Sequence, residues 1–163
     1  MREEHRVHQV SRAGLLIGVG MGGFVHGIVL HQIAQWHSML SNLVPPHTMD
    51  TMRLNMMWDG LFHALTWLVT LVGILQLRTA AATRSAMPSL QAFAGQLILG
   101  WGVFNLVEGL IDHQILGLHY VREVPNATVY NLTFLGVGGA LFILLGWLLM
   151  RAGSRASSTE VRE

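Results

Sequence analysis

The stretch that decides the fold of this chain is Glu108-Gly109-Leu110-Ile111-Asp112-His113-Gln114, which His119 follows after a short gap. It lies in a long apolar segment, where ionisable side chains are costly and usually functional. A matching pattern lies 82 positions earlier, and only one of eight paired positions differs. Gly18, Gly20, His26, Gly27, His31, Gln32, Ile33 and His37 pair with Gly100, Gly102, Glu108, Gly109, His113, Gln114, Ile115 and His119. We interpret this pattern as an internal duplication whose two copies face each other across a polar site.

The composition indicates a membrane protein with an unusual number of histidines. A length of 163 residues favours one domain. Only 12% of the residues are charged, against about 25% in soluble proteins. The chain has no cysteine, which excludes disulfides, thiolate metal sites and cysteine nucleophiles. Its net charge of +1 gives no indication of nucleic-acid binding, whereas nine histidines point to a polar site.

Four apolar segments have the length of about 20 residues that a helix needs to cross a bilayer. We expect transmembrane helices over about 13–36, 59–77, 93–119 and 129–150. Segments 1–12 and 151–163 are polar ends outside this 13–150 domain. Because helices satisfy their own backbone hydrogen bonds in lipid, the predicted fold class is all-α. We expect an integral membrane four-helix bundle of two duplicated helical hairpins, related by an axis along the membrane normal.

Arginine placement predicts the orientation in the membrane. Cytosolic loops carry an excess of basic residues, and eight of the ten arginines lie on the side of the termini. These are Arg2, Arg6, Arg12, Arg78, Arg84, Arg151, Arg155 and Arg162, with Arg53 and Arg122 on the other side. We therefore expect a multi-pass protein of the bacterial inner membrane with both termini in the cytosol and loops 38–57 and 120–128 outside.

The polar residues of the spans gather toward the outer half. On an α-helical wheel His26 and His37 share one face, and so do Glu108, Asp112 and His119. His31 and His113 are turned by about 140° from His26 and Glu108. His37 and His119 each lie eleven residues further on, which is roughly 16 Å along a helix axis.

Buried carboxylates near the centre of a bilayer cost about 2.5–3.5 kcal/mol each, and the chain has no lysine to pair with them. Imidazoles and carboxylates on facing helices form di-iron and di-manganese sites and also suit zinc. We expect a divalent or redox metal ion (iron, copper or zinc). The candidate ligands are His26, His31, His37, Asp59, His63, Glu108, Asp112, His113 and His119.

Two other interpretations of the polar residues remain open. One is a proton relay or a hydrogen-bonded core without metal. The other is a haem between two histidines, for which the glycines between 18 and 23 and at 100 and 102 would make room. Close packing of helices is the simpler role for these glycines.

The loop before the second span is rich in methionine, with Met39, Met49, Met52, Met56 and Met57 around His47. Thioether and imidazole groups suit Cu(I). Their spacing of three and four residues also fits an amphipathic helix at the membrane surface, and this second interpretation is the one we favour.

Three motifs resemble the bacterial four-span membrane proteins catalogued as domain of unknown function 2243. They are HGIVLHQIAQWH (26–37), WDGLFHA (58–64) and NLVEGLIDHQILGLHYVRE (105–123), and the resemblance covers about residues 13–150. It implies a fold but no activity. It also implies an association with assembly factors of cytochrome oxidase, and so with copper or haem handling. Asn131 stands where members of that family commonly have aspartate, mirroring Asp59, which implies a neutral oxygen there.

Three hypotheses for function follow. The first is an outward-facing metal site that binds metal or supports respiratory enzymes by redox chemistry, with a respiratory oxidase or its assembly factors as partners. The second is a membrane-embedded di-metal oxidoreductase acting on a lipid or quinone. The third is a non-enzymatic scaffold or proton-relay subunit. The lipid bilayer is a partner in all three, and nucleic acid in none.

Overall fold

A computed structural model describes the backbone of residues 2–83 and 87–160 and the side chains of residues 12–83 and 87–155. This part of the chain folds into helices without strands, which confirms the all-α prediction. Three of the long helices contain a π-helical segment, labelled η, in which the helix is wider than an α-helix. The elements in order are α1 (Arg2–His26), η1 (Gly27–Ile33), α2 (Met49–Ala82), α3 (Leu90–Glu108), η2 (Gly109–Ile115), α4 (Ala127–Thr133), η3 (Phe134–Leu141) and α5 (Phe142–Glu160).

Four helices are long and apolar enough to cross a membrane, as the sequence predicts. Their bounds differ from the expected ones: the spans are Arg12–Ile33, Met49–Ala82, Leu90–Ile115 and Ala127–Arg155. The second helix starts earlier than expected because Thr48 and Thr51 cap it reciprocally. The Thr51 amide donates to Thr48 Oγ1 at 3.2 Å and the Thr48 amide donates to Thr51 Oγ1 at 3.0 Å.

The methionine-rich segment therefore belongs largely to a continuous helix. Met49, Met52, Met56 and Met57 lie in the first turns of α2 with exposed side chains, and Met39 lies in the preceding loop. The structure therefore places these four methionines at the start of the second span, and not in a separate helix before it.

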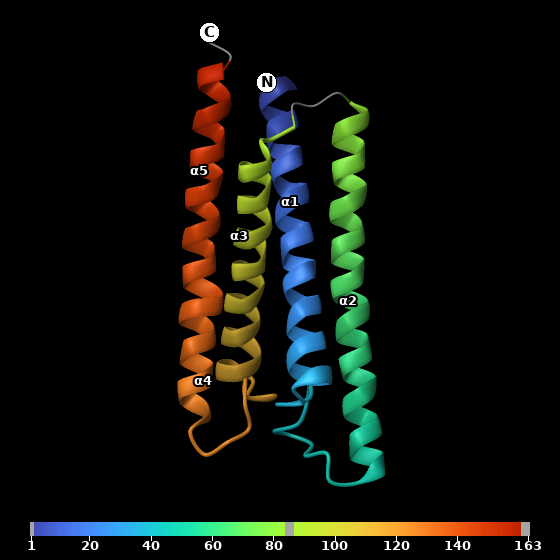
Figure 1. The fold of residues 1–163 in the computed structure, drawn as a ribbon. Coiled ribbons are helices and arrows are strands. Elements are labelled where there is room, and N and C mark those ends of the chain that lie inside the picture. The colour runs from blue at the N-terminus through green and yellow to red at the C-terminus, as the bar shows by residue number, and fades with distance from the viewer. Residues whose placement is uncertain (1, 84–86, 161–163) are drawn as a thin grey trace.

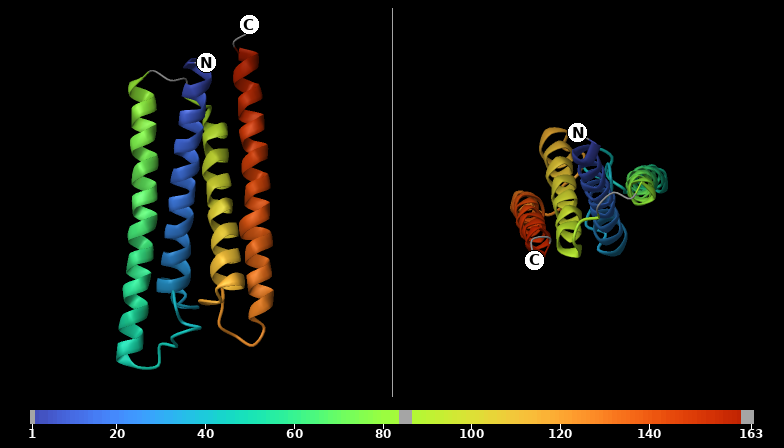
Figure 2. Two further views of the ribbon diagram at one scale, coloured as in Figure 1. Left: turned by 180° about the vertical axis from the view of Figure 1, so that it is seen from behind. Right: turned by 90° about the horizontal axis from the view of Figure 1, so that it is seen from above.

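The helices stand side by side in the order α5, α3, α1, α2 (Figure 1 and Figure 2). In the described residues α1 packs against α2 and α3, and α3 packs against α5. Helix α1 begins and helix α5 ends at one end of the molecule, and loops 34–48 and 116–126 lie at the other (Figure 1). Helices α2 and α5, which belong to the second spans of the two expected hairpins, thus lie on the two outer sides of the central α1–α3 contact. The duplication itself stays a prediction.

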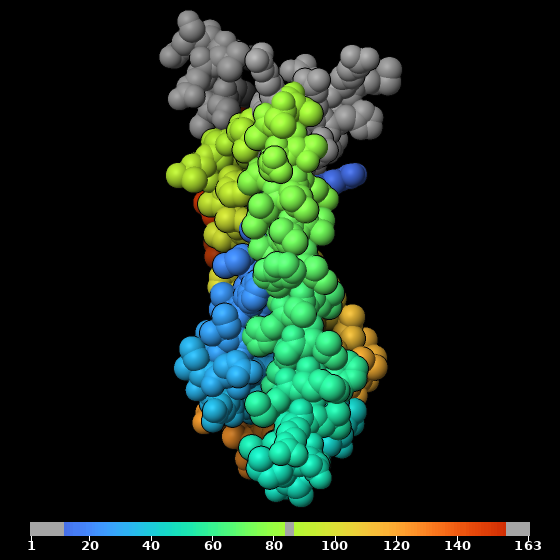
Figure 3. Space-filling view, turned by 90° about the vertical axis from the view of Figure 1, so that its right-hand side faces the viewer, coloured from blue at the N-terminus to red at the C-terminus, as the bar shows by residue number. Residues whose placement is uncertain are grey.

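The outer helices are exposed along most of their length. On α2 the side chains of Leu65, Trp67, Leu68, Val72 and Leu75 are all exposed, and Figure 3 shows this helix along the height of the molecule. Such a surface suits lipid, where apolar side chains need no cover from water.

Glycines let α1 and α3 approach until their backbones touch. A Cβ atom on Gly18 would overlap the backbone of Leu97, and one on Gly100 would overlap the backbone oxygen of Leu15 and come within 3.0 Å of Gly18 Cα. Small residues at crossing points are the usual means of close helix packing in membranes. This contact holds the two copies of the polar motif together.

Two residues after the end of each π-helical segment of the motif the backbone is left-handed, at Gln35 (φ 50°) in the first copy and Gly117 (φ 58°) in the second. A side chain in this conformation costs about 1–2 kcal/mol. We therefore expect Gly117→Ala to lower the thermal unfolding midpoint measured in detergent. Gln35→Ala is the matched control, because Gln35 already carries a Cβ, and it should change the midpoint little. Equal midpoints for wild type and Gly117→Ala would contradict this account.

Candidate metal centre

Two π-helical turns bring His31 of the first copy and His113 of the second copy onto the polar face. In η1 and η2 the backbone bonds run over five residues, for example from the Ala34 amide to the Val29 oxygen at 2.7 Å. Residues five apart then lie on one side, so His31 is buried near His26, and His113 near Glu108. The separation of about 140° expected from an α-helical wheel is wrong for both pairs.

The loops at this end fold back toward the membrane interior. Because the helices end at Ile33 and Ile115, the next histidines do not continue along the axis. His37 Nε2 lies 3.3 Å from His26 Nε2, and His119 Nε2 lies 3.2 Å from Glu108 Oε1. The expected placement of His37 and His119 at the outer rim, roughly 16 Å away, is therefore wrong.

The two loops interlock through reciprocal hydrogen bonds. His37 Nδ1 donates to the backbone oxygen of Val121 at 2.9 Å, and His119 Nδ1 donates to that of Met39 at 2.9 Å. These two pairs are related by the same shift of 82 positions. The backbone amides of Met39 and Val121 also make corresponding hydrogen bonds. The Met39 amide donates to Asp59 Oδ1 at 2.8 Å, and the Val121 amide donates to Asn131 Oδ1 at 3.0 Å. Asn131 thus supports the loop through its amide oxygen.

Five imidazoles meet in one buried cluster, which we call the histidine cluster: His26, His31, His37, His113 and His119. His37 and His119 stack with ring centroids 4.4 Å apart, and His31 lies 4.5 Å from His37. One ring nitrogen from each of His26, His37, His113 and His119 lies within 4.8 Å of the others.

Glu108 is the carboxylate that contacts three imidazoles of this cluster. Its Oε1 lies 2.9 Å from His113 Nε2, 3.2 Å from His119 Nε2 and 3.7 Å from His26 Nε2. The His113 contact is not aligned as a hydrogen bond, and the buried Oε2 has no hydrogen-bond partner among the described residues. Glu108 Oε2 is therefore the oxygen left for a ligand, while Oε1 accepts from His119 Nε2.

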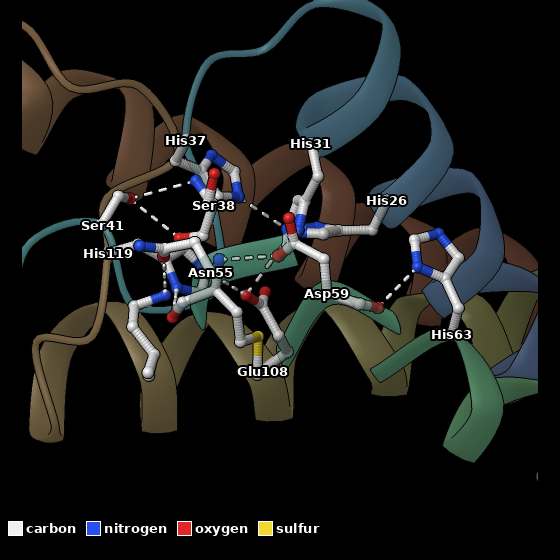
Figure 4. A network of polar contacts seen from close by, with 12 residues as sticks. His26, His31, His37, Ser38, Ser41, Asn55, Asp59, His63, Glu108 and His119 are labelled. Atoms are coloured by element: carbon white, nitrogen blue, oxygen red, sulfur yellow. Dashed lines mark hydrogen bonds and ion pairs between the residues drawn. The ribbon is translucent and has the colours of Figure 1, made fainter. Parts of the chain in front are cut away.

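Asp59 contacts the cluster through His31 (Figure 4). Its Oδ1 accepts hydrogen bonds from His31 Nδ1 at 2.9 Å and from the Met39 amide at 2.8 Å. A carboxylate that holds one imidazole nitrogen fixes the ring and leaves its other nitrogen free to bind a metal. The geometry favours this orienting role for Asp59 over direct ligation.

Two candidate ligands lie outside the cluster. His63 donates from Nδ1 to the backbone oxygen of Asp59 at 2.7 Å and stands to one side (Figure 4). The side chain of Asp112 is partly exposed, because η2 places His113 rather than Asp112 on the face of Glu108. The structure thus brings together seven of the nine candidates, if Asp59 is counted as a supporting residue.

The hydrogen bonds at Nδ1 determine which nitrogens can bind a cation. His31, His37 and His119 each direct Nδ1 to a fixed oxygen, so Nε2 is the nitrogen left for a ligand. Burial and the neighbouring imidazoles lower the pKa of His37, which keeps it neutral. Burial also lowers the pKa of His119, but the hydrogen bond and charge of Glu108 outweigh it and raise this pKa above its ordinary value. A cation would have to displace a proton from His119.

The donor set fits a metal ion. Buried polar atoms are normally hydrogen-bonded, yet this cluster has several without a partner among the described side chains: His26 Nδ1, His31 Nε2, Glu108 Oε2 and both ring nitrogens of His113. A bound cation would pair with several of them at once. The cluster contains imidazole and carboxylate donors, which suit iron, zinc and copper.

Sequence reasoning missed the residues that hold the folded-back loop. Asn55 is buried; its Oδ1 accepts from the Leu40 amide at 3.0 Å, and its Nδ2 donates to the Val44 oxygen at 2.9 Å. Ser41 donates to Glu123, which joins this loop to the other. A polar amide one turn before Asp59 was the available signal.

Comparison with known proteins gives a family but no characterised relative. A family model described as "Predicted membrane protein (DUF2243)" matches residues 13–153. No curated protein matches the chain, and no solved structure does.

Proposed function

The chain belongs to the predicted membrane protein family DUF2243, and from this premise we propose that it is a membrane metalloprotein. The histidine cluster and Glu108 would bind the metal, and Asp59 would orient His31. The observation that carries the proposal is the convergence of four imidazole nitrogens within 4.8 Å of one another, three of them on rings that contact the buried Glu108.

A hydrogen-bonded core without metal explains this convergence less well. In such a core each buried nitrogen should face a donor or acceptor of the opposite kind. Here His31 Nε2, His113 Nδ1 and Glu108 Oε2 are buried and have no hydrogen-bond partner among the described residues. We also do not propose haem at this site, because the imidazole rings contact one another directly.

The number of donors bears on the metal. The four histidines whose ring nitrogens converge match the four-coordinate geometry of structural zinc, and His31 and Glu108 lie beside them as further donors that iron or copper could use. We propose iron or copper, because a metal that supports respiratory enzymes by redox chemistry has to change its oxidation state, and imidazole donors suit both metals. Such a centre would supply one-electron redox chemistry, and this chain's residues would fix its position and exclude water.

The proposed location is the bacterial inner membrane, with cytosolic termini and the metal site near the outer surface. This orientation rests on the arginines: Arg53 in α2 and Arg122 in loop 116–126 lie at the end of the site, and Arg12, Arg78, Arg151 and Arg155 lie toward the other end. Arg84 and Arg162 lie outside the described residues. We propose redox or metal support of a respiratory oxidase or its assembly factors as the role.

Metal analysis tests the proposal. Protein purified without chelator should contain at least one iron or copper per chain. His37→Ala should reduce the affinity by about 100-fold or more, since changing a mere supporting partner of a ligand already costs about 10–100-fold. His63→Ala is the matched control, a histidine of the same end of the molecule outside the cluster, and should retain the metal. Wild-type protein without metal, or equal metal content in His37→Ala, would refute the proposal.

A further inference from the structure

We propose that a polar pocket at the loop end of the molecule is the entrance through which a metal ion passes between water and the histidine cluster. The proposal rests on the proposed function, and it adds the route by which the cluster is loaded. The pocket has a volume of about 360 Å³. It lies between loop 34–48 and the first turns of α2, and Glu123 of loop 116–126 also lines it.

Two histidines of the cluster form part of the wall of this pocket. His31 and His37 both line it, and they also contact the other imidazoles, since the His37 ring stacks on His119 with centroids 4.4 Å apart. His31 Nε2 has no hydrogen-bond partner among the described residues, so this ring can take up a cation without giving up a bond at that atom. An ion that enters the pocket therefore meets side chains of the cluster itself.

The rest of the lining suits a cation in transit. Among the described residues that line the pocket, Asp59 and Glu123 are the acidic ones, and neither arginine nor lysine accompanies them. The thioethers of Met52 and Met56 and the hydroxyl of Ser41 add further donors. Carboxylate groups suit hard metal ions and thioethers suit soft ones. A cleft lined by negative charge also raises the local concentration of cations and their rate of association.

The pocket is large enough for a metal ion with its hydration shell. Six water molecules at about 30 Å³ each fill about 180 Å³, which is half of the volume of about 360 Å³. Several lining residues are exposed, among them Gln35, Met52 and Glu123, so the pocket opens at the surface of the protein. A hydrated ion can therefore enter and exchange its water molecules for imidazole ligands one at a time.

Two further cavities reach the cluster, but their lining is apolar and faces the lipid. One includes His26 together with the exposed Val129. The other includes Glu108 together with the exposed Val107. Both valines lie within membrane spans, where a charge without partners is costly. A metal ion would have to lose its water before it entered either cavity, which favours the polar pocket as the entrance.

The test places one thiol in a chain that has no cysteine of its own. Met52→Cys puts it in the pocket, where Met52 is 43% exposed. Met57→Cys is the matched control, because Met57 lies on the same helix, is 53% exposed and does not line the pocket. A bulky methanethiosulfonate reagent is attached to each variant of the full chain in detergent. Cobalt(II) is then added to the chelator-treated protein, and its visible absorption reports uptake and release.

The label in the pocket should slow the uptake and the release of cobalt(II) alike. We expect each rate to fall at least about tenfold, because association that has to wait for a group to move aside is slower. The dissociation constant should stay the same, since the ligands of the cluster are unchanged. Labelled Met57→Cys should take up cobalt(II) at the wild-type rate, and reductive removal of the label from Met52→Cys should restore that rate.

The outcomes separate the entrance from the metal site. An unchanged rate of uptake in labelled Met52→Cys, or equal slowing in labelled Met57→Cys, would overturn the entrance and leave the metal site in place. A weaker affinity with an unchanged rate of uptake would also overturn it, because the label would then act by distorting the cluster. If wild-type protein binds neither cobalt(II) nor iron nor copper, the proposed function fails and the entrance falls with it.

Discussion

Replacing Glu108 by glutamine should reduce metal affinity by about 100-fold or more while leaving the metal-depleted protein at least as stable as wild type. The metal affinity should fall because Glu108 Oε1 lies next to ring nitrogens of three imidazoles of the cluster, His113, His119 and His26. The retained stability follows because an amide of the same shape has no charge to bury, and its oxygen can still accept the hydrogen bond from His119 Nε2. Metal titration and thermal unfolding of chelator-treated protein measure the two effects.

The alternative role of Glu108 predicts the opposite stability change. If it serves as the partner of an imidazolium in a core without metal, losing its charge should cost about 3–5 kcal/mol, as for other buried pairs. Asp112→Asn is the matched control, since that carboxylate lies outside the cluster, and it should alter neither quantity strongly. A large loss of stability in Glu108→Gln, with metal content unchanged, would support the structural role and contradict ours.

The second large effect is expected at the contact between α1 and α3. Gly100→Val should prevent the two helices from meeting, because a side chain there would collide with the backbone of Leu15 and Gly18. Backbone atoms cannot move aside as a side chain can, so the loss should exceed the 1–3 kcal/mol typical of overpacking. We expect little folded protein in detergent, measured as the yield of the monodisperse peak in size-exclusion chromatography.

Gly60→Val is the matched control for this variant. Gly60 also lies within a transmembrane helix, but a Cβ atom there would meet nothing within 4 Å. Its yield should equal that of wild type. A normal yield and normal metal binding for Gly100→Val would show that the α1–α3 contact is not what holds the site together.

The sequence by itself determined the class of protein, its four spans and most members of the site. Long apolar segments require helices in lipid, and six histidines in or beside them could hardly be accidental. The shift of 82 positions also matched residues whose contacts correspond, such as His37 with Val121 and His119 with Met39. The positions of the arginines predicted cytosolic termini and loops outside the cell. In the structure these loops lie at the end of the molecule that carries the candidate site.

Only the tertiary structure decided which of these residues meet. A wheel of 100° per residue assumes α-helix throughout, but η1 and η2 carry five-residue hydrogen bonding that turns His31 and His113 inward and leaves Asp112 outside. The return of loops 34–48 and 116–126 depends on contacts between segments about 80 residues apart, including His119 to Met39. Local periodicity carries no information about either, because both arise from hydrogen bonds that close only when the two halves pack together.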